Sequence, residues 1–312
     1  MKIAILRNHI KNHAVNLDAL DNLEEANFAE QYLAKHHQIK QIAFVSDLHI
    51  VITELTTFQP DVVFNLVETV CNSDALSIIA VQLLEYLRIP YTGNRMMAQT
   101  ITANKTLTKK FLQRYRIPTP SSKFISNTDY IIKANTEHSS IGLDNSCIAR
   151  FKSANDLKQA LKKKVEATGI QEWMAEQYIE GREFNCAFIA NEILPPAEMC
   201  FDKEFIGHKI LTYEAKWDEK ADSYRQSKRS FEIAPSLKQR LIELTLLCQK
   251  KLKLKGYARV DFRMDANENL YVIDINTNPC ISPDSGFVAM VEQHALSIEE
   301  MFNKIMEDAF IS

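Results

Sequence analysis

The N-terminal part of the chain alternates between two hydrophobic periods. Short apolar runs predict buried strands, and stretches with apolar positions at helical spacing predict helices. In chain order the six segments are 2–6 (strand), 24–36 (helix), 41–46 (strand), 48–58 (helix), 61–67 (strand) and 74–87 (helix). Strands that alternate with helices indicate a parallel, doubly wound sheet. We therefore expect a Rossmann-like α/β domain over residues 1–94.

From residue 95 onward the pattern changes to helices set among pairs of short strands. Helices are predicted at 102–115, 155–167, 235–253 and 297–310. Strands are predicted at 123–126, 130–134, 147–151, 173–178, 183–190, 192–199, 257–264 and 269–276. The polar stretches 135–146 and 202–230 are expected to be loops. This order predicts two α+β subdomains, a central one over 95–179 and a C-terminal one over 180–312.

Residues 256–279 carry the most informative pattern, two apolar runs that flank a polar turn at 265–268. If Met264 pairs with Asn269, Arg259 lies opposite Asp274, although a bulge would shift this register. Because side chains alternate along a strand, one face then carries a charged and polar set. Its members are Arg259, Asp261, Asp274 and Asn276.

Charges placed between apolar strands are costly unless they are paired or bind a metal. The carboxylates of Asp261 and Asp274 and the amide oxygen of Asn276 are hard ligands. Such ligands suit Mg²⁺, which commonly shares its coordination with phosphate oxygens. The alternative interpretation is a cross-strand ion pair between Arg259 and Asp274 on an exposed face. The pattern alone leaves both open.

The run Arg-Val-Asp-Phe, followed by an acidic residue and Asn-x-Asn-Pro, resembles the ATP-grasp superfamily, and within it the D-alanine–D-alanine ligase branch. The resemblance implies that Asp261, Asp274 and Asn276 hold two Mg²⁺ ions, or Mn²⁺ in their place, on the phosphates of ATP. It also implies that Arg259 stabilises the transferred phosphoryl group and the tetrahedral intermediate. Asp274 stands where this branch usually has Glu, so the carboxylate there is shorter.

Residues 176–183 resemble the segment that reads adenine in that branch. The resemblance assigns Glu176, Gln177 and the backbone near Ile179 to adenine, and Glu183 to ribose. Taken without the resemblance, the same residues describe a surface hairpin with solvated acids.

Other residues match the branch at the phosphates of ATP. Lys105 and Lys133 stand where two family lysines reach the phosphates. Ser139 and Ser140 lie in a small-residue loop that folds over them, and Lys216 lies in a mobile loop near the γ-phosphate or the substrate. A single lysine or serine outside this context is usually a solvated surface residue.

At three segments expected near the first substrate, the sequence departs from that of the branch. Residues 7–13 have no Gly-rich, Glu-containing motif, residues 68–74 replace a His-Gly loop, and residues 278–286 replace a Gly-rich end loop. Ser285 matches the serine that holds the acceptor carboxylate. Asp284 is predicted to recognise an amine or hydroxyl, or else to cap a turn. The residues expected to contact ATP match the branch, and those expected to contact the first substrate do not. This predicts the same reaction on a different substrate.

We therefore expect a ligase that joins a carboxylate to an amine through an acyl phosphate, with amino acids or a peptide as substrates. The alternatives are a strict D-alanine–D-alanine ligase and a non-catalytic, ATP-binding regulatory module. A Rossmann dinucleotide site is not expected, because no G-x-G-x-x-G follows the first strand. The branch is often dimeric, so a homodimer is also expected.

Composition indicates which binding partners and which cellular compartment to expect. The net charge of −3 gives no strong field, so nucleic acid is not an expected partner. No apolar run reaches the roughly 18–20 residues that span a bilayer. The six cysteines are scattered without a C-x-x-C pair, as expected for free thiols in a reducing compartment. We therefore expect a cytoplasmic protein without membrane contact.

Overall fold

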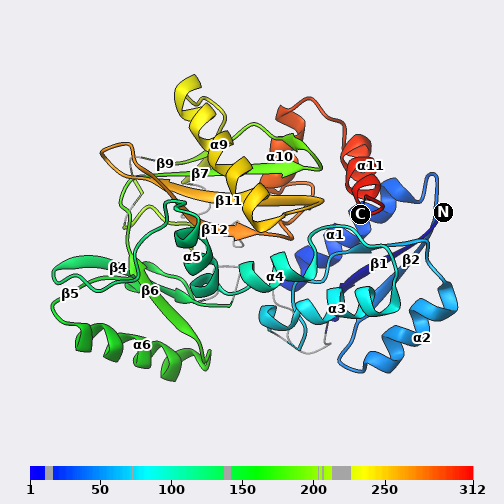
Figure 1. Cartoon of the computed structure of the whole chain (residues 1–312), viewed down its shortest axis with the longest axis horizontal. Helices are drawn as coiled ribbons and strands as arrows, with labels where there is room; N and C mark the ends of the chain where they lie inside the picture. Colours follow the sequence, from blue (N-terminus) through cyan, green and yellow to red (C-terminus); the bar gives the residue numbers. More distant parts are fainter. Residues whose placement is uncertain are drawn as a thin grey trace.

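The computed structural model describes residues 1–10, 17–71, 73–136, 142–202, 204–205, 207–212 and 226–311. Within these ranges the strands form three sheets. Figure 1 shows the N-terminal sheet at one end of the molecule, and the central and C-terminal sheets stacked at the other end. None of the described helices is both long and apolar enough to span a bilayer.

The N-terminal unit is the predicted parallel sheet. Its strands are β1 (Lys2–Asn8), β2 (Gln38–Phe44) and β3 (Val62–Asn65), in the order β2-β1-β3. Its helices are α1 (Leu17–Leu33), α2 (Leu48–Phe58), the short η1 (Asp74–Leu76) and α3 (Ile78–Leu87). Helix α1 begins well before the predicted residue 24, because the polar residues Asn22 and Glu25 face the interior and break the expected amphipathic pattern.

The central unit begins with two helices where one was predicted, α4 (Met96–Thr102) and α5 (Lys105–Arg114). The Asn104 side chain separates them, since it accepts the Leu107 N–H at 2.9 Å as an N-cap. The antiparallel sheet follows in the order β5-β4-β6, with α6 on it. These elements are β4 (Thr128–Ala134), η2 (Asn145–Cys147), β5 (Ile148–Phe151), α6 (Ala154–Thr168) and β6 (Trp173–Gln177). The strand predicted at 123–126 is wrong, since these residues form no strand.

The C-terminal unit is a larger antiparallel sheet, in which the order is β10-β9-β7-β11-β12 and β8 pairs with β7. Its strands are β7 (Arg182–Ile189), β8 (Glu192–Ile193), β9 (Ala197–Phe201), β10 (Ser227–Ser230), β11 (Tyr257–Met264) and β12 (Leu270–Asn276). Its helices are α9 (Pro235–Leu252), α10 (Gly286–Gln293) and α11 (Ile298–Asp308). The single strand predicted at 192–199 is two strands, because Pro195 and Pro196 have no N–H to donate.

The predicted register of the last hairpin is wrong by one residue. Met264 pairs with Leu270 rather than Asn269, and the register shifts between Asp261 and Phe262. Beyond this bulge, Asp261 lies opposite Asp274 and Arg259 lies opposite Asn276. The one-residue shift and the bulge together keep four polar side chains on one face, those of Arg259, Asp261, Asp274 and Asn276.

One hydrophobic core joins the N-terminal and C-terminal units. It contains Ile3 and Phe64 of the parallel sheet, Ile189 of β7, and Phe302 of α11. The rings of Phe28 and Phe302 lie 5.6 Å apart, so α1 packs directly on α11. The central unit instead has a small core of its own around Tyr130. The boundaries proposed near residues 94 and 179 remain a prediction.

The N-terminal and C-terminal units also approach each other closely where the backbone at Gly256 lies beside the backbone at Gly93. Gly256 has a φ of +65°, and a Cβ there would lie 2.7 Å from the Gly93 Cα. We expect Gly256→Ala to lower the free energy of unfolding by about 2–4 kcal/mol, from backbone strain and overpacking. Urea unfolding measures the loss.

Gly169→Ala is the matched control for Gly256→Ala. Gly169 has a φ of +74° at the end of α6, and a Cβ there would meet nothing within 4 Å. It carries the conformational strain without the steric clash, so we expect it to cost only about 1 kcal/mol. Equal losses in the two variants would contradict a close approach at Gly93.

Candidate active site

Strands β11 and β12 present a charged face to the central unit. The Arg259 guanidinium donates two hydrogen bonds to the Asp261 carboxylate, at 2.8 and 3.0 Å. Asp261 also accepts the Asn185 amide at 2.7 Å, from the neighbouring strand β7. Asp274 lies directly across from Asp261, and Asn276 lies across from Arg259. The structure therefore brings the four predicted residues together.

The ion pair on this face differs from the alternative considered from the sequence. Arg259 pairs with Asp261 on its own strand, whereas the sequence suggested Asp274. Burial, the largest influence, would lower the pKa of Arg259, but the Asp261 carboxylate outweighs it and the pKa is raised. Arg259 therefore stays charged, and its bidentate pair fixes the direction of the guanidinium.

The donor set on this face fits a divalent cation shared with a ligand. Among the described residues, no three His, Cys, Asp or Glu side chains come together to hold a metal ion. Asp261 and Asp274 supply only two facing carboxylates, and Asn276 adds an amide oxygen. Mg²⁺ is typically held by one or two carboxylates, with the remaining positions filled by phosphate oxygens and water. The residues present suit that arrangement.

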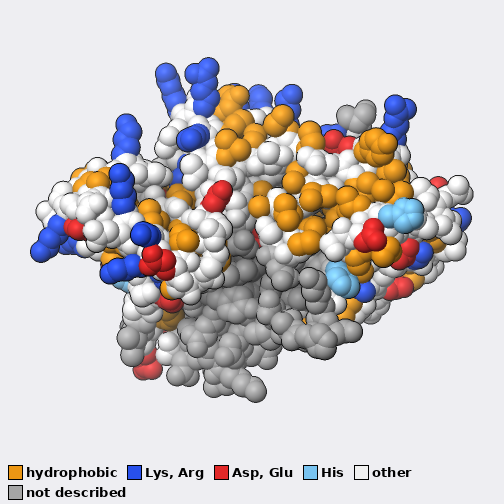
Figure 2. Space-filling model, turned by 90° about the horizontal axis from the view of Figure 1, so that it is seen from below, with side chains coloured by type: hydrophobic (Ala, Val, Ile, Leu, Met, Phe, Trp, Pro, Cys, Tyr) orange, Lys and Arg blue, Asp and Glu red, His pale blue; other side chains and the backbone are white. Residues whose placement is uncertain are grey.

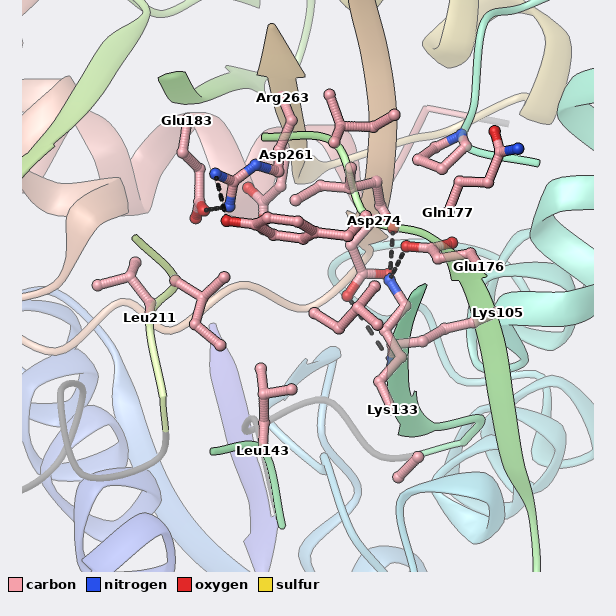
Figure 3. A pocket seen from close by; sticks show the side chains of 17 residues that line it. Lys105, Lys133, Leu143, Glu176, Gln177, Glu183, Leu211, Asp261, Arg263 and Asp274 are labelled. Atoms are coloured by element: carbon pink, nitrogen blue, oxygen red, sulfur yellow. Dashed lines mark hydrogen bonds and ion pairs between the residues drawn. The ribbon is translucent and has the colours of Figure 1, made fainter. Parts of the chain in front are cut away.

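A cavity of about 120 Å³ lies between the central and C-terminal sheets, and Figure 3 shows the side chains around it. It is lined by the residues predicted to contact nucleotide, namely Lys105, Lys133, Glu176, Gln177, Ile179 and Glu183. Asp261 and Asp274 close one side. Apolar side chains such as Ile131, Leu211 and Ile273 supply flat walls suited to a base.

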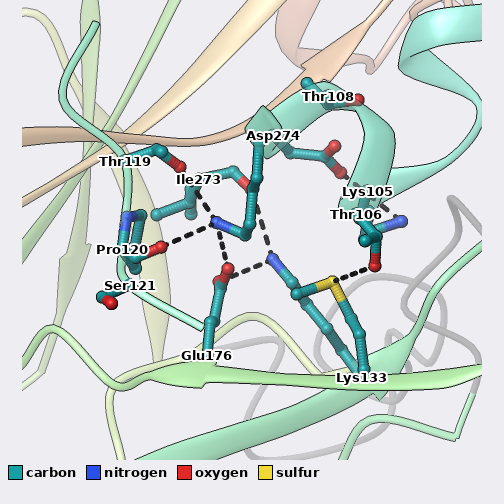
Figure 4. A network of polar contacts seen from close by, with 12 residues as sticks. Lys105, Thr106, Thr108, Thr119, Pro120, Ser121, Lys133, Glu176, Ile273 and Asp274 are labelled. Atoms are coloured by element: carbon teal, nitrogen blue, oxygen red, sulfur yellow. Dashed lines mark hydrogen bonds and ion pairs between the residues drawn. The ribbon is translucent and has the colours of Figure 1, made fainter. Parts of the chain in front are cut away.

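A buried carboxylate paired with two lysines forms part of the wall of this cavity, and Figure 4 shows its polar contacts. Glu176, 2% exposed, pairs with Lys133 at 2.8 Å and with Lys109. Burial, the largest influence, would raise the pKa of Glu176, but the two lysines outweigh it and lower the pKa. Lys105 approaches Asp274 at 3.9 Å. The Glu176 carboxylate predicted to read adenine is thus held by lysines in this structure.

Lys109 and Arg263 are site residues that the sequence analysis missed. Lys109 follows Lys105 by one helical turn on α5, and it donates to the Thr119 hydroxyl at 2.9 Å. Arg263 is 4% exposed and donates to Glu183 at 3.2 Å and to the Gly181 carbonyl at 3.0 Å. Both could have been found, since helical spacing and strand alternation extend the predicted faces to them.

A larger cavity of about 530 Å³ adjoins the first one. Arg259 and Asn276 line it, and so do the predicted substrate residues Asp284 and Ser285. Ser285 caps α10 by accepting the Val288 N–H at 3.2 Å. Asp284 was predicted to recognise an amine or hydroxyl, or else to cap a turn. Its carboxylate accepts the Ser282 hydroxyl at 3.0 Å.

Asp261 is one of the few residues that line both cavities. A group bound at Asp261 would therefore face the smaller cavity on one side and the larger cavity on the other. The predicted residues Ser139, Ser140 and Lys216 lie outside the described residues. Their roles remain predictions.

Comparison with known proteins identifies the family. The family model described as D-ala D-ala ligase C-terminus matches residues 122–307. The D-alanine–D-alanine ligase of Carboxydothermus hydrogenoformans is 31% identical over 246 residues, which cover 72% of this chain and 74% of that protein. This chain belongs to the D-alanine–D-alanine ligase family. It is therefore an ATP-dependent ligase that forms a C–N bond and releases ADP.

Two further similarities to D-alanine–D-alanine ligases extend over most of the chain. The ligase of Chelativorans sp. is 26% identical over 302 residues, which cover 90% of each chain. The ATP-complexed ligase of Bacillus anthracis has a TM-score of 0.76 at 19% identity and covers 100% of this chain and 98% of its own. This structural likeness confirms the ATP-grasp fold expected from the sequence.

Proposed function

We propose that the chain activates a carboxylate as an acyl phosphate and joins it to an amine of an amino-acid-like acceptor. The observation that supports this most strongly is the position of Asp261. It faces Asp274 across the hairpin, anchors Arg259, and lines both cavities. A γ-phosphate at this point lies within reach of a carboxylate bound in the larger cavity.

The proposed chemistry needs charge neutralisation more than a side-chain nucleophile. When bound, two Mg²⁺ ions supply positive charge to the phosphate oxygens. Asp261, Asp274 and Asn276 hold them in our proposal, and Arg259 stabilises the charge on the transferred group. Lys105 and Lys133 are proposed to bind phosphate oxygens, and Glu183 the ribose. An apolar wall excludes water, which would otherwise hydrolyse the acyl phosphate.

A strict D-alanine–D-alanine ligase is the second candidate. The names of the relatives favour it, and one of them matches along 90% of both chains. The departures at residues 68–74 and 278–286 favour a different first substrate, because these two segments line the larger cavity at Glu68, Asn278 and Cys280. Residues 7–13 also depart from the branch. A non-catalytic module is disfavoured by membership of a ligase family.

ADP formation across pairs of amino acids, with the product masses, tests the proposal. The panel contains D-alanine alone and D-alanine with other D- and L-amino acids, small acids and dipeptides. We expect ADP formation that requires two substrates, and a product whose mass equals the two minus water. A single product from D-alanine alone would favour the strict ligase. ATP binding without turnover on any pair would contradict both candidates.

The homodimer, the cytoplasmic location and the absence of nucleic acid remain predictions. Figure 2 shows apolar side chains gathered on the half of one face that belongs to the N-terminal unit in Figure 1. In that unit Tyr86 is 82% exposed, and Met97 of the adjoining helix α4 is 64% exposed. Exposed apolar surface of this kind supports contact with a second copy.

A further inference from the structure

The three segments that depart from the ligase branch are joined by one buried network of hydrogen bonds. The network begins at Asn8, which ends β1 and is 4% exposed. The Asn8 side-chain oxygen accepts the N–H of Glu68 at 2.9 Å and that of Thr69 at 3.1 Å. The first departing segment thus holds the second one in place.

Helix α1 carries the network onward through Asn22, which is 1% exposed. The Asn22 oxygen accepts the Asn8 N–H at 2.9 Å. The Asn22 amide donates to the Leu66 carbonyl at 2.7 Å and to Glu25 at 3.2 Å. Each of these polar groups is satisfied by a partner from another segment, as buried polar groups require.

Glu25 connects α1 to the third departing segment. It is 1% exposed, and one of its oxygens accepts the Ile281 N–H at 2.6 Å. Next to it, the Cys280 thiol donates to Asp21 at 3.1 Å and lies 2.9 Å from the Ser282 hydroxyl. Ser282 in turn donates to Asp284. A single buried carboxyl therefore holds the segment that carries the predicted substrate residues.

This segment forms part of the wall of the larger cavity. Asp21, Cys280 and Ser282 line that cavity together with Arg259. The resemblance to the ligase branch places the backbone N–H of residue 280 next to the tetrahedral intermediate. Residue 280 must then be placed accurately, since a displacement of about 1 Å can cost on the order of 100-fold in rate. The hydrogen bond from the next N–H, that of Ile281, to Glu25 restrains residue 280 from its C-terminal side.

We propose that Glu25 is a positioning residue for the ligase reaction, which holds the Cys280–Ile281 peptide against the cavity by accepting the Ile281 N–H. The inference rests on the proposed function.

The protonation of Glu25 gives the proposal a measurable signature. Burial, and then the Asp21 carboxylate, raise the pKa of Glu25 to about 8. The groups that face it are Asp21 on the same helix, Cys280 on the end loop, and Tyr257 of β11. Below pH 8 the carboxyl is neutral beside Asp21. Because this pKa lies above the usual 4.5, the stability that the neutral carboxyl contributes is lost as the pH rises from about 4.5 to about 8, and above pH 8 a second negative charge stands beside Asp21.

Three variants test the proposal. Hydrogen exchange measures the protection of the Ile281 amide in each of them and does not depend on catalytic turnover. Glu25→Ala removes the acceptor, Glu25→Gln keeps an acceptor oxygen but cannot ionise, and Glu30→Gln changes a carboxyl on the same helix that pairs with Gln41 at 2.6 Å. We expect the Ile281 amide to exchange at least about tenfold faster in Glu25→Ala, and at the wild-type rate in the other two. Unchanged exchange in Glu25→Ala would overturn the proposal. If that variant does not fold, rapid exchange in Glu25→Gln would also overturn it.

ADP formation with Mg·ATP and a substrate pair that supports turnover in the panel described above supplies the functional readout. We expect kcat of Glu25→Ala to fall at least about tenfold, with the KM for ATP within about twofold. Wild-type kcat should decline above pH 8 by about tenfold per pH unit, and Glu25→Gln should lack this decline. The same decline in Glu25→Gln, or equal loss of kcat in all three variants, would overturn the positioning role. Faster exchange of the Ile281 amide in Glu25→Ala, together with no turnover by the wild type on any substrate pair, would instead contradict the proposed function.

Discussion

Asp261→Asn should reduce the rate of ADP formation at least about 100-fold while leaving the fold intact. The substitution keeps the shape of the side chain but removes one of the two facing carboxylates proposed to hold metal ions. It also removes the bidentate partner of Arg259, which is then free to turn away from the transferred phosphoryl group. Steady-state kinetics with saturating Mg·ATP measures the effect, and circular dichroism checks the fold.

Asp129→Asn is the matched control for Asp261→Asn. Asp129 also forms a bidentate pair with an arginine, accepting from Arg150 at 2.8 and 2.7 Å, but it lies on the exposed surface of β4 and lines neither cavity. Exposed ion pairs contribute little to stability. We expect rates within about twofold of wild type. Full activity in Asp261→Asn would contradict the assigned metal and arginine roles together.

Glu176→Gln should destabilise the protein by about 3–5 kcal/mol and remove ATP binding. The variant leaves Lys109 and Lys133 buried and close together without their shared counter-charge. Breaking a buried ion pair by removing one partner is much costlier than losing a surface pair. Thermal unfolding measures the stability, and isothermal titration with ATP measures the binding.

The dependence of stability on acidic pH distinguishes the ionic contribution of Glu176 from the contribution of its packing. Because the pKa of Glu176 is lowered from its usual 4.5, the ionised pair contributes stability above that pH and loses it as the pH falls through the lowered value. Glu176→Gln should therefore lose less stability between about pH 5 and pH 3 than the wild type.

Glu166→Gln, which breaks the exposed pair with Lys162, is the control for Glu176→Gln. We expect its stability to change by less than about 0.5 kcal/mol, because both side chains are solvated. A wild-type melting temperature for Glu176→Gln would contradict the structural role of the buried carboxylate.

The sequence predicted those parts of the fold in which the local pattern and the tertiary environment agree. The alternation of strands and helices before residue 94 identified the parallel sheet, since β1 and β3 are buried on both faces. Strand β10 and helix α10 were missed for opposite reasons. The run Ser227–Ser230 has no apolar alternation and is a strand only because it pairs with β9. In α10, Phe287, Val288, Met290 and Val291 are all buried, so the helix has little polar contrast.

The candidate site was predictable where a polar residue interrupted an apolar strand. Arg259, Asp261, Asp274 and Asn276 could be placed on one face despite a wrong register, because the bulge restored the alternation. The network at Glu25 could not be predicted in this way. Polar residues on a helix normally face water, and nothing in the sequence indicates that the Glu25 carboxyl meets a backbone N–H more than 250 residues away.

The packing of α1 on α11 has a consequence for the order in which the protein can fold. The face of α1 that carries Phe28 and Tyr32 is covered by Phe302 from the last helix. During synthesis domains generally fold from the N-terminus onward. Here that face of the first unit stays open on the ribosome until residues 298–308 have emerged. The N-terminal unit thus completes its core only after α11 has been made, and it exposes the apolar side chains of Phe28 and Tyr32 until then.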